Sequence, residues 1–158
     1  MIKIGLIGTS PGNGHPFSYS AIFNGYNPNA LQKICPYDLI KEYLPKYHNP
    51  KKKNKYATIS HIYCQNSNDA LNISKVSNIK NISKNINDLI KNVDAIILAR
   101  DDPQNYFPLL KKLILTRKPL FVDKQFVHTK KNFNEFKKII LNNQKFMYGS
   151  AMKFSDDV

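Results

Sequence analysis

Residues 3–15 read KIGLIGTSPGNGH, so an apolar segment leads directly into a loop that holds three glycines. The run Ile2–Ile7 is typical of a strand that is buried on both faces. A strand that ends at glycine and gives way to a helix brings unpaired backbone N–H groups and the positive end of the helix dipole to one point. This arrangement suits a phosphate group, and a nucleotide site is the first hypothesis.

The glycine spacing differs from the dinucleotide-binding fingerprint, G-x-G-x-x-G. With Gly8 as the first glycine, Ser10 stands at the second glycine position and Asn13 at the third. Glycine also serves tight turns that bind nothing, because it adopts positive φ without steric cost. A plain turn is therefore the alternative to a phosphate-binding loop. The candidate cofactor-binding residues of this loop are Gly8, Thr9, Ser10, Gly12, Asn13, Gly14 and His15.

Strand and helix patterns alternate along the rest of the chain. The further predicted strands are 56–63, 78–81, 94–99, 119–123 and 145–154. The predicted helices are 17–23, 38–44, 68–75, 86–90, 106–116 and 132–142. This order predicts an α/β, Rossmann-like, doubly wound fold, with a mostly parallel six-stranded sheet and helices on both faces. Ligands of such folds bind at the carboxyl ends of the strands.

The 158 residues fit one domain, which we expect to be a single Rossmann-like nucleotide-binding domain over 1–158. Residues 24–55 interrupt the pattern. Gly25 and several prolines fall in this stretch, and only Asp38–Leu44 has a helical pattern. We therefore expect an irregular insertion, and long segments of this kind are often functional.

The composition limits the classes of function. The formal net charge is +13, but nearly all of the positive charge is lysine, spread along the chain. Only Arg100 and Arg117 supply the guanidinium fork that nucleic-acid contacts favour, so we do not expect a nucleic-acid partner. The sequence shows no charged-then-apolar pattern of a leader and no long apolar run, and Cys35 and Cys64 lack a paired spacing. We expect a cytoplasmic protein with no membrane partner.

Polar residues follow the predicted strands 94–99 and 119–123. Arg100 can meet a phosphate or a substrate carboxylate, or it can be a surface residue paired with Asp101 or Asp102. These two acids also suit a turn and a helix cap before the next helix, and we expect no metal site there. Lys124, at the end of the second strand, can polarise a carbonyl or orient a hydroxyl. The candidate cofactor-binding residues at the strand ends are Gln65, Ala99, Arg100 and Asp123.

The segments DAIILA (94–99) and RKPLFVDK (117–124), with the helix between them, resemble the amino-terminal half of the Gfo/Idh/MocA family of oxidoreductases. Family members have a VDAVVIATP strand followed by a GKHVFVEKP strand, and the lysine of the second contacts cofactor and substrate. The segment Gly14–Tyr26 also looks like one branch of this family. The resemblance extends over the whole chain. It implies NAD or NADP as cofactor, a sugar derivative as substrate, and Lys124 as the catalytic residue.

The chain departs from the family pattern at three places. Gln125 stands where the family has a proline after the lysine. Gln65 and Asn66 stand where an acidic residue would bind the ribose hydroxyls, and Asp69 comes only later. Family enzymes also continue into a second domain that carries the substrate pocket and the acid/base residues, whereas this sequence ends at Val158.

These departures leave two hypotheses. The first is a truncated, cofactor-binding half of an NAD(P)-dependent sugar oxidoreductase, inactive alone. The second is a non-catalytic Rossmann-like binding or assembly module that has lost its affinity for the dinucleotide. The surface that the second domain would cover is expected to promote self-association into a homo-oligomer.

Overall fold

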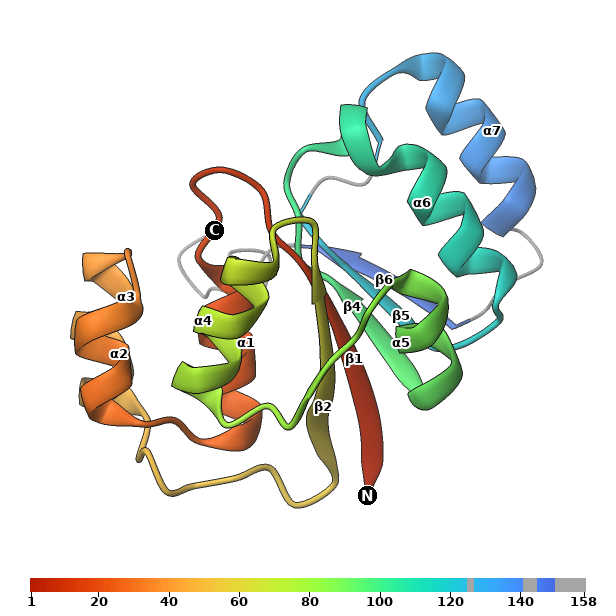
Figure 1. Cartoon of the computed structure of the whole chain (residues 1–158). Coiled ribbons are helices and arrows are strands. Elements are labelled where there is room, and N and C mark those ends of the chain that lie inside the picture. Colours follow the sequence, from red (N-terminus) through yellow and green to blue (C-terminus); the bar gives the residue numbers. More distant parts are fainter. Residues whose placement is uncertain (125–126, 141–144, 150–158) are drawn as a thin grey trace.

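The computed structural model describes residues 1–124, 127–140 and 145–149 (Figure 1). The strands are β1 (Ile2–Gly8), β2 (Ala57–Cys64), β3 (Asn81–Ile82), β4 (Ala95–Leu98), β5 (Leu120–Asp123) and β6 (Phe146–Gly149). The helices are α1 (His15–Asn24), α2 (Pro28–Ile34), α3 (Asp38–Tyr47), α4 (Ser67–Ser77), α5 (Ile86–Asn92), α6 (Pro103–Leu115) and α7 (Lys130–Ile140).

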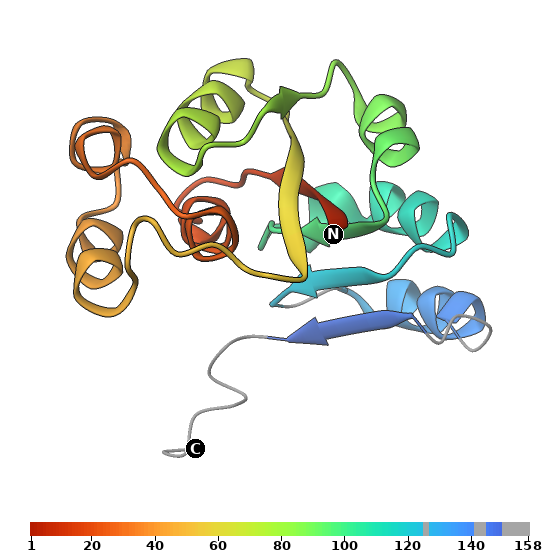
Figure 2. The same ribbon diagram turned by 90° about the horizontal axis from the view of Figure 1, so that it is seen from below.

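The six strands form one sheet in the order β3-β2-β1-β4-β5-β6, and every neighbouring pair is parallel. The strand order reverses between β1 and β4, which is the point where a doubly wound sheet binds its ligand. Helices α1 and α4 cover one face, and α5, α6 and α7 cover the other (Figures 1 and 2). The predicted Rossmann-like, doubly wound architecture is confirmed.

The core has two parts, one on each face of the sheet. On β1, Ile4 and Leu6 pack with Phe17 of α1 and Ile73 of α4. Ile7 points the other way and joins the apolar side chains of α5 and α6. Successive side chains of a strand face opposite sides, so a strand in the middle of a two-sided sheet must be apolar throughout. The apolar run of β1 therefore reflects its central place in the sheet.

The insertion at 24–55 is more regular than its sequence pattern suggests. Besides α3, it contains α2, which was expected to be irregular. The Asn27 side chain accepts a hydrogen bond from the backbone N–H of Ala30 at 3.1 Å, and Pro28 occupies the first turn, where proline needs no hydrogen-bond partner. Leu31 is fully buried. Both helices pack outside α1 and α4 (Figure 2).

Two predicted strands differ from the observed ones by more than one residue. The third was expected at 78–81, but Asn78 takes a left-handed conformation that ends α4, and the strand begins at Asn81. The sixth was expected at 145–154 and is found at Phe146–Gly149, while 150–154 lie outside the described residues. In the described part of the chain, no helix is both long and apolar enough to cross a membrane.

Candidate functional site

The carboxyl ends of β1, β2, β4 and β5 lie along the upper edge of the sheet in Figure 1, where the predicted site residues meet. Hydrogen bonds join the loop after β1 to the loop after β4 and to the first turn of α4, which follows β2. Thr9 donates to Asp69 at 2.8 Å, and Ser10 donates to Asp101. Asn13 donates to the backbone oxygen of Ala99 at 3.4 Å. The topology therefore gathers the candidates from all four loops into one region.

The glycine loop spans residues 9–14, between β1 and α1. The backbone N–H of His15 donates to Asn13 Oδ1 at 2.9 Å, and that of Phe17 donates to the Gly14 oxygen at 3.0 Å. Pro16 has no N–H. The first helical turn therefore keeps few donors for a phosphate. Gly12, in contrast, has φ +79° and nothing within 4 Å of the place where a Cβ would lie, so its backbone is open to a ligand.

A cavity of about 450 Å³, here called the loop cavity, lies between the glycine loop and the end of β2. Its polar lining includes Thr9, Ser10, Gln65, Asn66 and Asp69. Asp69 was not among the candidate residues, because it stands five residues beyond the end of β2. In the structure it lies in the first turn of α4, which begins three residues after β2, and Thr9 holds its carboxylate at the cavity.

Arg100 is buried, with 4% of its surface exposed, and is paired with Asp102. Its Nε donates to Asp102 Oδ1 at 2.8 Å, and its Nη2 donates to the other carboxylate oxygen. The two alternatives for Arg100 were binding of a phosphate or substrate carboxylate, and a surface ion pair with Asp101 or Asp102. The structure shows an ion pair with Asp102, and this pair is buried rather than at the surface. Burial raises the pKa of Asp102, yet the hydrogen bonds from Arg100 and Asn105 outweigh it and leave the pKa below its usual value. Asp102 takes the N-cap position of α6 without a side-chain cap bond.

Lys124 directly follows β5 and has φ +63°. Its Nζ lies 3.0 Å from Asp101 Oδ2, and Ser10 donates to the other oxygen of the same carboxylate. Burial raises the pKa of Asp101, but the hydrogen bonds from Ser10 and Lys124 outweigh it and hold the pKa below the ordinary value. The candidate catalytic lysine is thus tied to the glycine loop through one shared acid.

His15 and Asp123 form a second polar cluster beside Lys124. Asp123 is fully buried, and its two oxygens accept from different residues. His15 Nδ1 lies 2.6 Å from Oδ2, and the Tyr19 hydroxyl donates to Oδ1 at 2.9 Å. Burial and the neighbouring Asp123 carboxylate raise the pKa of Tyr19, so its hydroxyl stays protonated and remains a donor. Tyr19 was not among the residues expected at the site.

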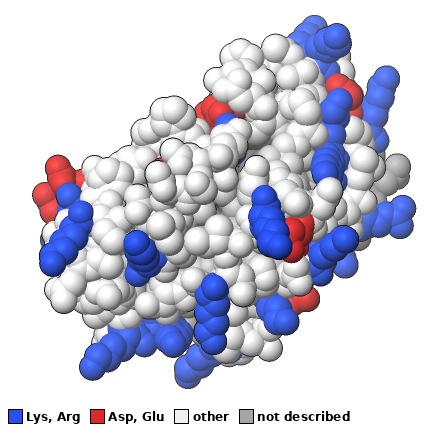
Figure 3. Space-filling view, in the orientation of Figure 1, with Lys and Arg blue, Asp and Glu red and all other residues white. Residues whose placement is uncertain are grey.

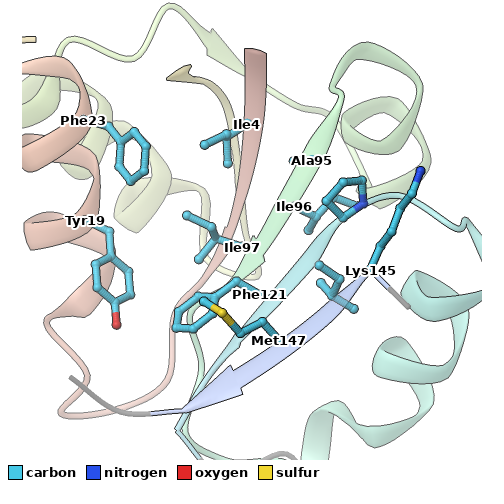
Figure 4. A pocket seen from close by; sticks show the side chains of 11 residues that line it. Ile4, Tyr19, Phe23, Ala95, Ile96, Ile97, Phe121, Lys145 and Met147 are labelled. Carbon is cyan, nitrogen blue, oxygen red and sulfur yellow. The ribbon is translucent and has the colours of Figure 1, made fainter. Parts of the chain in front are cut away.

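Two further hollows border the site. A cavity of about 460 Å³, here called the α1–α3 cavity, is lined by His15, Tyr19 and Lys124 together with Tyr37 and Tyr43 of the insertion. An apolar groove of about 410 Å³ lies over β1, β4, β5 and β6, where Phe121 and Met147 lie opposite Tyr19 of α1 (Figure 4). The groove brings together almost no polar groups, so a polar ligand finds few partners there.

Other candidate residues have structural roles. A Cβ on Gly8 would lie 2.9 Å from the ring of Pro16, so this glycine allows α1 to start close to the sheet.

Cys35 and Cys64 are buried and unpaired, and burial raises the pKa of Cys64 to about 12, which suppresses its thiolate. Within 1–124, 127–140 and 145–149, no cluster of metal-ligating side chains is found. The lysines and arginines are scattered over the face seen in Figure 3.

Comparisons with solved structures place this fold among dehydrogenases. Scyllo-inositol dehydrogenase from Lactobacillus casei matches 99% of the chain at 13% identity and a TM-score of 0.63. Myo-inositol 2-dehydrogenase from Lactobacillus plantarum matches 98% at 16% identity and a TM-score of 0.64. UDP-N-acetylglucosamine 3-dehydrogenase from Acidithiobacillus ferrooxidans matches 94% at 10% identity and a TM-score of 0.61. The chain spans 38% of the length of each of these proteins.

The fold and these neighbours define a Rossmann-like domain of the type found in inositol and sugar dehydrogenases. At these low identities the likeness establishes the shared fold. The predicted resemblance to the Gfo/Idh/MocA oxidoreductases is confirmed at this level. No protein-family model matches the sequence, and no curated protein matches it.

Proposed function

We propose that this chain is the cofactor-binding half of an NAD(P)-dependent oxidoreductase that acts on a sugar derivative or a cyclic polyol. The observation that carries the proposal is the loop cavity, which lies between a glycine loop and the end of β2, next to the switch point of the sheet. One structural neighbour, the scyllo-inositol dehydrogenase of Lactobacillus casei, holds NAD(H) and scyllo-inositol. The bound nicotinamide would supply hydride chemistry at a hydroxyl-bearing carbon.

The residues of the loop cavity fit the adenosine end of a dinucleotide. Asp69, Gln65 and Asn66 offer oxygen acceptors to the ribose hydroxyls. The carboxylate of Asp69 would repel a 2′-phosphate, so we propose NAD rather than NADP as the cofactor. The open backbone at Gly12 gives the pyrophosphate a place to approach the loop. Lys124, as the candidate catalytic residue, would orient a substrate hydroxyl at the nicotinamide end of the same edge.

The hydrogen bonds at the start of α1 support the second hypothesis, a non-catalytic module. The backbone N–H groups of His15 and Phe17 already donate hydrogen bonds, and Pro16 has no N–H, so the amino-terminal end of α1 offers few donors to a pyrophosphate. The carboxylates of Asp69 and Asp101 also lie next to the glycine loop, where they oppose an anion. These features predict weak dinucleotide binding, and they define the measurement that separates the two hypotheses.

Calorimetric titration of the chain with NAD⁺ and NADP⁺ tests the proposal. We expect saturable binding of NAD⁺ and weaker binding of NADP⁺. An absence of heat with both dinucleotides at millimolar concentration would favour the non-catalytic module. We expect no sugar-dependent reduction of NAD⁺ by this chain alone, and an absorbance assay for reduced nicotinamide measures it directly.

A further inference from the structure

The α1–α3 cavity lies beside the loop cavity and has a different lining. Its walls are the apolar and aromatic side chains of Leu39, Ile40 and Tyr43 from α3, together with Ile22 of α1. Tyr37 lines both cavities and so lies between them. At about 460 Å³ the cavity is within the usual size of small-molecule sites. The insertion at 24–55 therefore builds a second candidate binding space.

Two polar side chains of this cavity, His15 and Tyr19, are positioned by hydrogen bonds to the buried Asp123. Asp123 is fully buried, and its carboxylate accepts from His15 Nδ1 at 2.6 Å and from the Tyr19 hydroxyl at 2.9 Å. An imidazole whose Nδ1 donates to a carboxylate presents its other nitrogen, Nε2, as an acceptor when the ring is neutral. No described residue forms a hydrogen bond with Nε2 of His15, which is the ring nitrogen left for a ligand. The side chain of His15 is 33% exposed and lines the cavity.

Lys124 lines the same cavity and supplies donors. Its Nζ contacts Asp101 at 3.0 Å and carries three N–H groups, so the ion pair does not use all of them. The cavity thus combines one oriented acceptor, one group with spare donors, and the rings of Tyr37 and Tyr43. Aromatic rings pack against the C–H faces of a compact ring, while hydroxyl groups can both donate and accept.

We propose that the α1–α3 cavity binds a hydroxyl-bearing ring, such as a cyclic polyol or a sugar, with one hydroxyl donating to Nε2 of His15. Asp123 is the positioning residue, because it fixes the ring nitrogen that faces the ligand. The assignment deepens the proposed function by giving its substrate a site within this chain. The role of this ligand as a substrate rests on the proposed function, whereas the binding of the ligand in the cavity does not.

The test uses scyllo-inositol as the probe and follows the side-chain nitrogens of His15 by NMR. We expect the Nε2 resonance of His15 to move as the polyol saturates the wild-type chain. His15→Asn keeps an amide donor where Nδ1 lies and removes Nε2, so Asp123 stays paired. This variant should bind scyllo-inositol about tenfold more weakly, the effect of losing one hydrogen bond. His61→Asn, on β2, is the matched control and should bind as the wild type does.

A second variant does not depend on the polar cluster. Ile22→Trp places a larger ring at a position that is 40% exposed and lines the cavity, so it should block binding while the protein stays folded. An unmoved Nε2 resonance, or equal affinity of His15→Asn and the wild type, would overturn the assignment.

Titration with NAD⁺ on the same sample distinguishes the two proposals. Binding of NAD⁺ without any response to the polyol overturns this inference alone, whereas a polyol response without NAD⁺ binding supports the cavity and counts against the proposed function.

Discussion

His15 Nδ1 lies 2.6 Å from Asp123 Oδ2, although the two residues are 108 positions apart in the chain. His15 begins α1 and Asp123 ends β5, so this contact ties the helix that follows the glycine loop to the far half of the sheet. Because the carboxylate is fully buried, its charge must be compensated by the groups that donate to it. The contact therefore sets both the position of α1 and the orientation of the imidazole.

Asp123→Asn should reverse the tautomer of His15. An amide at this position can donate to Nδ1, and the proton of the neutral ring would then move to Nε2, as in other His–Asp pairs converted to His–Asn. Loss of the charge-assisted hydrogen bonds should also lower the free energy of unfolding by about 2 kcal/mol. Nitrogen NMR of the histidine side chains reports the tautomer, and urea denaturation reports the stability.

Asp38→Asn is the control for this change. Its carboxylate is exposed and pairs with Lys41 on the surface of α3, so its loss should affect the free energy of unfolding much less than Asp123→Asn. If Asp123→Asn leaves the proton on Nδ1, the buried carboxylate does not determine the tautomer.

Asp69→Asn should weaken NAD⁺ binding by about tenfold, because a neutral amide accepts hydrogen bonds from ribose hydroxyls less strongly than a carboxylate does. The variant should also discriminate less against NADP⁺, since it removes the charge that repels the 2′-phosphate. Calorimetric titration with each dinucleotide measures both effects. Asp88→Asn is the matched control: Asp88 likewise lies in the first turn of a helix, α5, but outside the loop cavity. Equal effects of the two substitutions would argue against a role of Asp69 in binding.

The apolar runs of the sequence predicted the sheet well, because central parallel strands must be apolar on both faces. Helix α2 was not predicted, because its sequence lacks an apolar pattern. It has seven residues and a single buried side chain, Leu31, which is too few to show helical periodicity. A contact distant in sequence helps to hold its start, since the backbone N–H of Asn27 donates to the Val76 oxygen of α4 at 2.8 Å. Such tertiary support leaves no local periodicity.

The position of the candidate site in the fold could be predicted from the sequence, but the ion pairs within it could not. Parallel topology puts the residues after β1, β4 and β5 at one edge, so the sequence predicted that His15, Arg100 and Lys124 would lie near one another. Which acid each cation would meet depends on side-chain geometry that no spacing rule contains. Arg100 pairs with Asp102, two residues away, whereas Lys124 reaches Asp101, which follows the neighbouring strand β4. Asp69 was noted in the sequence but not chosen as a candidate, because the expected acid lies at the strand end and this carboxylate comes from the following helix.

Lys124→Met should destabilise the protein in a pH-dependent way. The folded state holds the pKa of Asp101 below its ordinary value, so this carboxylate stabilises the fold above about pH 4 and the stabilisation is lost as the pH falls through the lowered pKa. Removing Lys124 should cost roughly 0.5–1 kcal/mol near neutral pH, since the pair is partly exposed. The difference from the wild type should shrink in acid, as measured by urea denaturation at several pH values. Lys75→Met, an exposed position on α4, should show little change at any pH, and a pH-independent effect of Lys124→Met would contradict the ion pair.

Gly25 and Gly12 allow a matched comparison of backbone strain and space. Both have positive φ, +72° and +79°. Alanine at Gly12 should incur about 1–2 kcal/mol of strain, and alanine at Gly25 more, because the ψ of 178° at Gly25 belongs to a region that essentially only glycine adopts. At Gly12 an added Cβ meets nothing within 4 Å, whereas at Gly25 it would lie 2.4 Å from the Pro50 oxygen. That oxygen also accepts from the Tyr26 N–H at 2.9 Å, a contact that joins the two ends of the insertion.

Gly25→Ala should therefore lower the free energy of unfolding by at least about 3 kcal/mol, and Gly12→Ala by no more than about 2 kcal/mol. Urea denaturation measures both. Because the insertion supplies walls of the α1–α3 cavity, a folded Gly25→Ala protein should also bind scyllo-inositol more weakly than the wild type. Equal stabilities of the two variants would mean that the Pro50 segment can move aside, and that the insertion is less firmly attached to α1 than these contacts imply.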